Sequence, residues 1–309
     1  MPKRKTPLEN DTHMADADSQ SEDEARDPEV LSDMEVSDEE GSVVDETDLT
    51  QVEFEFFDPR QGDFHAIKRF WSQLLGSDHT LLDTSGLADT VVGQPLLGTC
   101  VKTEGSESDP YALLSVLNLT HRVQEGEAPI QGLVEYLRGK VQGNAQLAKV
   151  LSLKKDEGHV AFLMSERLLN MPWQVAPPMY RMLAEEVTWA VEDGEPYQFA
   201  WYVLMSKVYR SVVSTADADM PDAPLPKGGA GKKVRRRPED AETSMVHAEE
   251  EIIQEFAETI CDFPLTQPPE SADSKRAFQE QGIEPRRRLY LIQASKVPAM
   301  MDALDRAGS

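Results

Sequence analysis

The residue types that carry most enzyme chemistry occur in this chain, but not at the spacings that catalysis or metal binding requires. Its six histidines are scattered and none lies at i, i+4 from another, so no helical metal-binding pair is formed. Cys100 and Cys261 form no C-x-x-C motif. No P-loop, G-x-G-x-x-G, G-x-S-x-G or H-E-x-x-H motif is present. We therefore predict no catalytic, cofactor-binding or metal-binding residue, and only a triad of residues distant in sequence stays open.

Two weaker catalytic candidates have simpler interpretations. The adjacent carboxylates Glu185 and Glu186 could form a general acid/base pair, but their position favours the outer or boundary face of a helix. His65, His121 and His159 are interpreted as structural or surface groups, because no second metal ligand or nucleophile accompanies them.

Clusters of basic residues are the first feature with functional weight. The strongest follows a glycine-rich stretch, and a second lies at the N-terminus; together they give the nuclear-localisation candidates Lys232, Lys233, Arg235, Arg236, Arg237, Lys3, Arg4 and Lys5. Such runs fit the acidic grooves of import receptors, although contact with nucleic acid or a solvated linker would also explain them. Arg286, Arg287 and Arg288 directly precede an apolar run, so we interpret them as a strand-edge or surface feature.

The second feature is the acidic N-terminal segment. Its first 50 residues carry 17 acidic and 4 basic side chains, which is about half of the net charge of −25. With so few apolar residues, 1–48 is predicted to be a disordered tail. The acids most suited to a basic client are Glu22, Asp23, Glu24, Asp38, Glu39 and Glu40, and the serines followed by acids, which are phosphorylation candidates, are Ser21, Ser32 and Ser37. A tail that only maintains solubility is the alternative.

The overall charge and hydropathy exclude several classes of protein. Strong negative charge opposes direct binding to a nucleic-acid backbone and favours basic protein partners. The longest apolar runs, 111–119 and 199–205, are far shorter than the roughly 20 residues of a membrane helix, and no apolar stretch resembles a signal peptide. We expect an intracellular protein in a reducing compartment, with no membrane partner.

The first half of the folded part alternates strand and helix patterns. Val52, Phe54 and Phe56 alternate with glutamates, which predicts a strand. Asp63 is positioned to cap a helix that ends at Gly76. The remaining expected elements are strands at 98–102 and 111–120, a helix from Pro129 to Val141, a short helix over 147–151 and a central strand at 160–165.

The second half continues in the same way, with two interruptions. We expect a helix from 179 to 194, a buried strand at 197–208, a flexible basic linker at 214–245, a loop at 265–285, a strand at 289–292 and a helix at 297–304. The segment 249–263 fits either a helix or a strand. These elements predict one mixed α/β domain over 49–309, with helices packed against a mixed sheet.

Three segments together resemble the BCCIP family, including its fungal members. They are Val52-Glu53-Phe54-Glu55-Phe56-Phe57-Asp58-Pro59, then Asp63-Phe64-His65-Ala66-Ile67-Lys68-Arg69-Phe70, and the stretch from Leu168-Leu169-Asn170-Met171-Pro172 to Val175-Ala176-Pro177-Pro178-Met179-Tyr180. The resemblance covers most of 51–309. It implies the α/β fold of the GCN-five-related acetyltransferases, in which 249–263 would be a strand.

The resemblance also implies a function. Members of the family are nuclear proteins that act by binding others, in nuclear export, as chaperones of a large-subunit ribosomal protein, and with cell-cycle and recombination factors. An acetyltransferase of this fold holds the cofactor pyrophosphate on a glycine-containing loop after the fourth strand. We place that loop at 122–128, where Arg122 is one residue too far from Gly126 and Glu125 and Glu127 would repel a pyrophosphate.

We therefore expect a non-enzymatic nuclear protein, shuttling to the cytoplasm, that uses no cofactor. Its expected partners are a basic client, a large-subunit ribosomal protein, together with nuclear import and export receptors. The alternatives are a scaffold for cell-cycle or recombination factors and, less favoured, an acyl-CoA-dependent N-acetyltransferase. The identity of the client, the contact residues on the domain and the oligomeric state stay open. The leucine-rich stretch 147–153 is interpreted as a core helix rather than an export signal.

Overall fold

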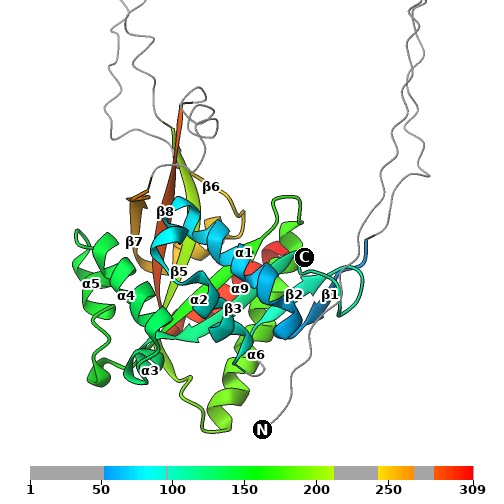
Figure 1. Cartoon of the computed structure of the whole chain (residues 1–309), viewed down its shortest axis with the longest axis horizontal. Coiled ribbons are helices and arrows are strands. Elements are labelled where there is room, and N and C mark those ends of the chain that lie inside the picture. Colours follow the sequence, from blue (N-terminus) through cyan, green and yellow to red (C-terminus); the bar gives the residue numbers. More distant parts are fainter. Residues whose placement is uncertain (1–51, 95–96, 212–242, 268–281, 309) are drawn as a thin grey trace, which may run out of the picture. The chain divides into compact units, whose positions relative to one another are not determined.

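A computed structural model of the chain describes residues 52–94, 97–211, 243–267 and 282–308. Within these ranges the chain forms one eight-stranded sheet with helices on both faces (Figure 1). The predicted mixed α/β class is therefore confirmed. No helix in the described ranges combines the length and the apolar character that crossing a bilayer requires.

The sheet is mixed because one pair of neighbouring strands is parallel. Its order is β1 (Glu55–Phe57), β2 (Thr99–Lys102), β3 (Ala112–Asn118), β4 (His159–Arg167), β5 (Phe199–Ser211), β8 (Ile283–Gln293) and β7 (Ala257–Pro264), with β6 (Thr243–Met245) beside β5. β4 and β5 are parallel and are joined by the crossover helix α6 (Ala176–Glu192), while the other pairs are antiparallel. β5 and β8 form the longest pair.

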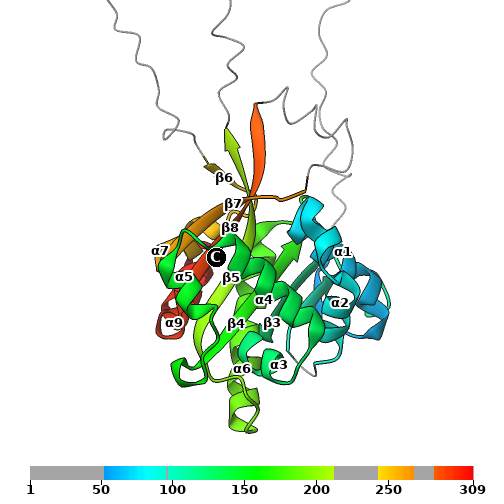
Figure 2. The same ribbon diagram turned by 60° about the vertical axis from the view of Figure 1, so that its left-hand side comes forward.

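The helices divide between the two faces of the sheet, as Figures 1 and 2 show. One core contains α1 (Phe64–Leu75), α2 (Thr84–Val92), α3 (Leu119–Gln124), α4 (Ala128–Lys140) and α5 (Ala145–Val150). The other contains α6, α7 (Glu250–Phe256) and α9 (Val297–Gly308). Short 3-10 turns occur at Gln61–Asp63, Gly76–Leu81, Lys155–Glu157, Trp173–Val175 and Ala294–Lys296.

β4 shows how one strand serves both cores. Phe162 and Met164 point into the core beneath α1, while Ala161 and Leu163 point into the core beneath α6, as the period of two in a strand requires. Trp71 of α1 stacks on Phe162 with ring centroids 5.7 Å apart. An apolar run without alternation in polarity is what a strand covered on both faces needs, so the predicted central strand is confirmed.

Several expected boundaries change for local reasons. α1 ends at Gly76 as predicted, but Asp63 does not cap it; its carboxylate is buried and accepts from the Lys102 ammonium at 2.6 Å. The strand expected over 111–120 ends at Asn118, whose side chain accepts the N–H of His121 and begins α3. α2 was not predicted, although Asp83 caps it by accepting the N–H of Gly86.

The interpretation of 249–263 as a single strand is wrong. Residues 250–256 form α7, as the spacing of Ile252, Ile253 and Phe256 indicates, and only 257–264 form β7. Two other elements enlarge the sheet at the expense of expected loops. β6 forms within the range expected for the basic linker, and β8 begins at Ile283, inside the range expected for a loop.

Candidate functional site

A cluster of buried ionisable side chains lies where β4 and β5 part. The parallel pairing of the two strands ends at Leu163 and Leu204. β5 stays paired with β8, but its other edge has no strand beside it until β6 joins at Val208. The chain segment before α7 enters this opening and brings buried polar groups with it. The buried members of this β4–β5 cluster are Glu166, Arg167, Ser206, His247, Glu249 and Glu250, together with the half-buried Lys207.

Two ion pairs and one hydrogen bond hold the β4–β5 cluster together. Arg167 forms a two-pronged pair with Glu249, with 2.8 Å between Nη2 and Oε2. The Lys207 ammonium contacts Glu166 at 2.5 Å. The Ser206 hydroxyl donates to Glu250. Because a buried charge is tolerated only when it is paired, these contacts account for the charged members of the cluster.

The two remaining groups are neutral at pH 7. Burial raises the pKa of Glu250 to about 8, with the carboxylates of Glu249 and Glu166 adding to the effect. Burial beside Arg167 and Lys207 lowers the pKa of His247 to about 3. Arg167 and Lys207 therefore each face one carboxyl group, while Glu250 and His247 are uncharged. Burial also raises the pKa of Glu166, an effect that the nearby Lys207 ammonium opposes. The cluster leaves only two orphaned atoms, Glu166 Oε1 and His247 Nε2.

The start of α6 is unsuited to an anion such as a pyrophosphate. α6 is the helix after the fourth strand, so the relevant loop is 168–175 and our placement of it at 122–128 is wrong. The loop contains no glycine, and Pro177 and Pro178 remove two N–H donors from the first turn of α6. Arg122 instead pairs with Glu127 at 2.8 Å in the connection between α3 and α4.

Other candidate positions have structural surroundings. Among the described residues, no group of three His, Cys, Asp or Glu side chains gathers as a metal site. His65 is exposed, while His121 and His159 are half-buried, and His159 contacts the amide of Asn118. Leu147, Val150 and Leu151 belong to the core, as expected for this stretch. Nothing in this set brings a nucleophile and a base together.

Two predictions about charged residues are wrong. Glu186 does not lie on an outer or boundary face: it is buried, and its Oε2 accepts the backbone N–H of Gly98 at 2.8 Å, while Glu185 is exposed. Arg287 and Arg288 are not at a strand edge or on the surface either. Arg287 donates to the carbonyl oxygen of Leu74, and Arg288 pairs with Asp262 at 2.6 Å. Both predictions failed because partners distant in sequence make burial of these charges possible.

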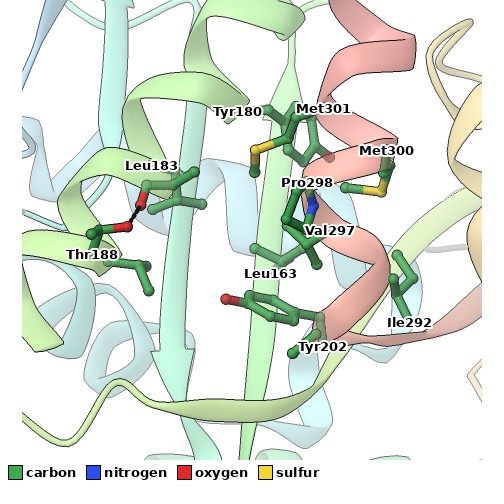
Figure 3. Close-up of a pocket in the computed structure, with 13 residues that line it drawn as sticks. Leu163, Tyr180, Leu183, Thr188, Tyr202, Ile292, Val297, Pro298, Met300 and Met301 are labelled. Atoms are coloured by element: carbon green, nitrogen blue, oxygen red, sulfur yellow. Dashed lines mark hydrogen bonds between the residues drawn. The ribbon is translucent and has the colours of Figure 1, made fainter.

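Within the described residues, a recess on the α6 and α9 face offers an opening for a ligand. It lies between the two helices over β4, β5 and β8 and has a volume of about 190 Å³ (Figure 3). Its lining is largely apolar and consists of Leu163, Tyr180, Leu183, Ala184, Val187, Thr188, Tyr202, Ile292, Ala294, Val297, Pro298, Met300 and Met301. We call it the α6–α9 recess. It has no ionisable group other than two tyrosines, so it can bind an apolar side chain but offers no acid–base chemistry at neutral pH.

The site residues predicted from sequence lie outside the described residues. These are the basic candidates Lys3, Arg4, Lys5, Lys232, Lys233, Arg235, Arg236 and Arg237, the acidic candidates Glu22, Asp23, Glu24, Asp38, Glu39 and Glu40, and the serines Ser21, Ser32 and Ser37. The β4–β5 cluster and the α6–α9 recess were not predicted. Their members come from elements far apart in sequence, and no local spacing marks them.

Comparison with known proteins identifies relatives over most of the chain. The sequence model of the BCCIP family matches residues 49–253. The chain is 42% identical to protein bcp1 of Schizosaccharomyces pombe over 254 residues, covering 81% of this chain and 87% of that protein. It is 38% identical to protein BCP1 of Gibberella zeae over 276 residues, covering 88% of this chain and 92% of that protein.

A solved structure supports the same assignment at the level of the fold. The crystal structure of BCP1 from Saccharomyces cerevisiae superposes with a TM-score of 0.58 at 22% identity, covering 85% of this chain and 92% of that chain. Family match, sequence identity and fold agree, and this chain belongs to the BCCIP family.

Proposed function

We propose that this protein is a non-enzymatic escort in the nucleus that binds a basic client, a large-subunit ribosomal protein, and accompanies it during nuclear transport. The observation that carries the proposal is the excess of acidic side chains in the chain, 56 against 31 basic ones. Such a surface attracts lysine- and arginine-rich partners and shields them from nucleic acid.

The excess of acid is found in the folded part as well as in the N-terminal segment. The described segment 243–267, which contains α7 and β7, carries acidic residues but no lysine or arginine. Glu251 and Glu255 of α7 are exposed. The domain therefore adds to the attraction that the acids of residues 1–48 exert, and phosphorylation of Ser21, Ser32 or Ser37 would add about 1.5 to 2 negative charges per site.

Transport requires contact with import and export receptors. The basic clusters are the candidate contacts for the import receptor. Lys232 to Arg237 and Lys3 to Lys5 are short dense runs in an otherwise acidic chain. We expect import to depend on them and the protein to shuttle between nucleus and cytoplasm. Substituting either run with serine and following a fluorescent fusion in cells tests this step.

Two features support a binding role over acyl transfer. The opening between β4 and β5 is filled by His247, Glu249 and Glu250, and the first turn of α6 contains two consecutive prolines. Both reduce the room and the N–H donors that an acyl-CoA would need. Calorimetry with acetyl-coenzyme A tests the alternative, and micromolar binding would favour the acetyltransferase.

The experiment that tests the proposal is affinity purification from nuclear extract at low and high salt. The full chain is compared with a variant that begins at Leu49 and with a full-length variant whose acids between residues 9 and 48 are changed to Asn and Gln. We expect one dominant basic ribosomal protein, reduced by salt and by both changes. Recovery of neutral cell-cycle or transport factors, insensitive to salt, would instead support a scaffold.

A further inference from the structure

We infer that the α6–α9 recess binds one large apolar side chain of the client, and that lysine or arginine residues flanking this side chain contact the carboxylates at the C-terminal end of α6. The inference rests on the proposed function and deepens it, because it names the contact surface on the folded domain. The partner is a basic protein segment with a leucine, methionine or phenylalanine among its cations.

The size and chemistry of the recess select an apolar side chain. Its volume of about 190 Å³ exceeds the ~150 Å³ of a cavity that admits benzene, so a phenyl or isobutyl group fits. Leu163 and Ile292 come from the sheet, while Val297, Pro298 and Met301 come from α9 (Figure 3). The two methionines on α9, Met300 and Met301, provide flexible walls that adapt to different partners.

The polar groups in the recess do not oppose this occupant. The Thr188 hydroxyl already donates to the Ala184 carbonyl oxygen at 2.8 Å within α6. Burial raises the pKa of Tyr202 to about 12, so its hydroxyl stays neutral. Tyr202 can therefore offer a hydrogen bond to the backbone of a bound segment without bringing a charge into the recess.

The periodicity of α6 extends the recess toward a charged end. Leu183, Ala184, Val187 and Thr188 line it at the spacing of one helix face, and Val191, which is 36% exposed, continues that face by one turn. Beyond Val191 come the exposed carboxylates of Glu192, Asp193 and Glu195. An apolar side chain in the recess would thus be followed, along its own chain, by residues facing these acids.

The two ends of the recess differ in charge. Near the start of α6, the Arg181 guanidinium pairs with Asp305 of α9 at 2.5 Å and also interacts with Glu185, so a cation already partners the carboxylates there. At the other end, none of Glu192, Asp193 and Glu195 forms an ion pair with a residue in the described ranges. They also lie at the negative end of the α6 dipole, in a helix with no basic residue in its last turn. Cations of a partner would relieve this unfavourable arrangement.

Charge complementarity argues against the other occupants. A second copy of this chain would bring a net charge of −25 to an acidic surface, and the acidic segment 1–48 would be repelled in the same way. The chain's own basic run at 232–237 has the right charge, but its one apolar residue is Val234, which is too small to fill the recess. A separate basic segment with a larger side chain meets both requirements.

The test uses the full chain and a labelled peptide of lysines with one central leucine, compared with the same peptide carrying alanine. Burial of the extra atoms of leucine should improve the dissociation constant about tenfold. Ala184→Phe fills the recess and should remove this difference. The surface triple variant Glu192→Lys, Asp193→Lys and Glu195→Lys, which does not alter the core, should weaken both peptides at least about tenfold.

A matched control separates local contacts from net charge. The control variant changes the net charge by the same amount, at three exposed carboxylates elsewhere on the surface: Asp89→Lys, Glu104→Lys and Glu135→Lys. It should alter the affinity for the peptides less than about threefold. Thermal unfolding of each variant verifies its fold. Equal losses in the two triple variants, or a leucine preference that survives Ala184→Phe, would overturn the inference.

The purified client distinguishes failure of the inference from failure of the proposed function. If the full chain retains the ribosomal protein in a salt-sensitive complex and the recess variants bind it equally well, only the recess assignment is wrong. If the full chain binds neither the client nor the peptides, both are wrong. Substitution of the run 232–237 by serine is the last arm: a rise of about tenfold in peptide affinity would show that this run occupies the recess, and would also overturn the inference.

Discussion

Replacing Glu250 by glutamine should remove a specific part of the dependence of stability on pH. Glu250 is buried in the β4–β5 cluster, and its pKa in the folded protein is about 8, against an ordinary value of 4.5. Between these two values the folded state binds a proton that the unfolded state has lost. Because a carboxyl group with a raised pKa is more stable as the neutral acid, the free energy of unfolding falls as the pH rises through this window.

His247 restricts the range in which the effect is visible. Its pKa falls from 6.5 to about 3 on folding, so between those values the unfolded state carries the extra proton and stability rises with pH. Between pH 4.5 and 6.5 the two contributions have opposite signs and largely cancel. From about pH 6.5 to 8, only Glu250 of these two residues changes the stability appreciably. At 1.36 kcal/mol per pH unit, it lowers the free energy of unfolding by about 2 kcal/mol.

Urea unfolding of the full chain at half-unit steps from pH 6 to 8.5 measures the effect. Glutamine keeps the shape of the neutral side chain and can accept from the Ser206 hydroxyl, so Glu250→Gln should already be more stable than the unmodified protein at pH 6.5. From pH 6.5 to 8 this difference in the free energy of unfolding should widen by about 2 kcal/mol, or about 5 °C in Tm. Parallel pH profiles for the two proteins between 6.5 and 8 would refute the assignment of a neutral Glu250.

Three further sets of substitutions test other parts of the structure. Arg167→Met should destabilise the fold by about 4 kcal/mol because it leaves Glu249 buried and unpaired, whereas Arg167→Met with Glu249→Met should recover most of the loss; denaturant titration of both variants checks this. Asp78→Asn should cost about 2 to 3 kcal/mol, because this carboxylate accepts from the N–H groups of Thr266 and Gln267, the Tyr136 hydroxyl and the Lys140 ammonium. Burial alone would raise the pKa of Asp78, but these partners outweigh it and lower the pKa. The stability that Asp78 contributes is therefore present above the unfolded pKa and is lost as the pH falls through the folded pKa. Acid titration of Asp78→Asn should lack that loss. Gly98→Ala should cost about 2 kcal/mol of stability, because Gly98 has a φ of 125° and a Cβ there would lie 2.8 Å from the Leu114 carbonyl oxygen. Gly105→Ala should cost about 1 kcal/mol, because Gly105 has a φ of 77° but open space around it. Comparing the Tm values of the two variants separates crowding from backbone strain.

The sequence predicted those elements whose burial is decided locally. α1, β4 and α6 each show the period of the face or faces that they bury, so their positions could be predicted within a few residues. α7 and β7 show the limit of this approach. The apolar residues of α7 follow a helical spacing up to Phe256, and β7 begins at the next residue. β7 forms because it pairs with β8, and the sequence of the segment itself does not reveal that pairing.

The β4–β5 cluster could not be predicted because its pairs connect distant parts of the chain. Lys207 and Glu166 are 41 residues apart, and Arg167 and Glu249 are 82 apart. Each of these residues alone is indistinguishable from a charge on a solvated surface, which is also why Arg287 and Arg288 were misplaced. The α6–α9 recess presents the same difficulty, since it appears only when two helices are placed on one face of the sheet.

The position of the acids on α6 bears on whether the negative charge has a function beyond solubility. Solubility depends on net charge, which carboxylates could supply anywhere on the surface at little cost. Glu192, Asp193 and Glu195 instead lie at the negative end of a 17-residue helix, where each opposes the dipole by about 0.3 to 1 kcal/mol. A solubility device gains nothing from that placement. A surface that must attract cations next to an apolar recess gains from this placement, because the unfavourable interaction with the helix dipole is relieved only when the partner is bound.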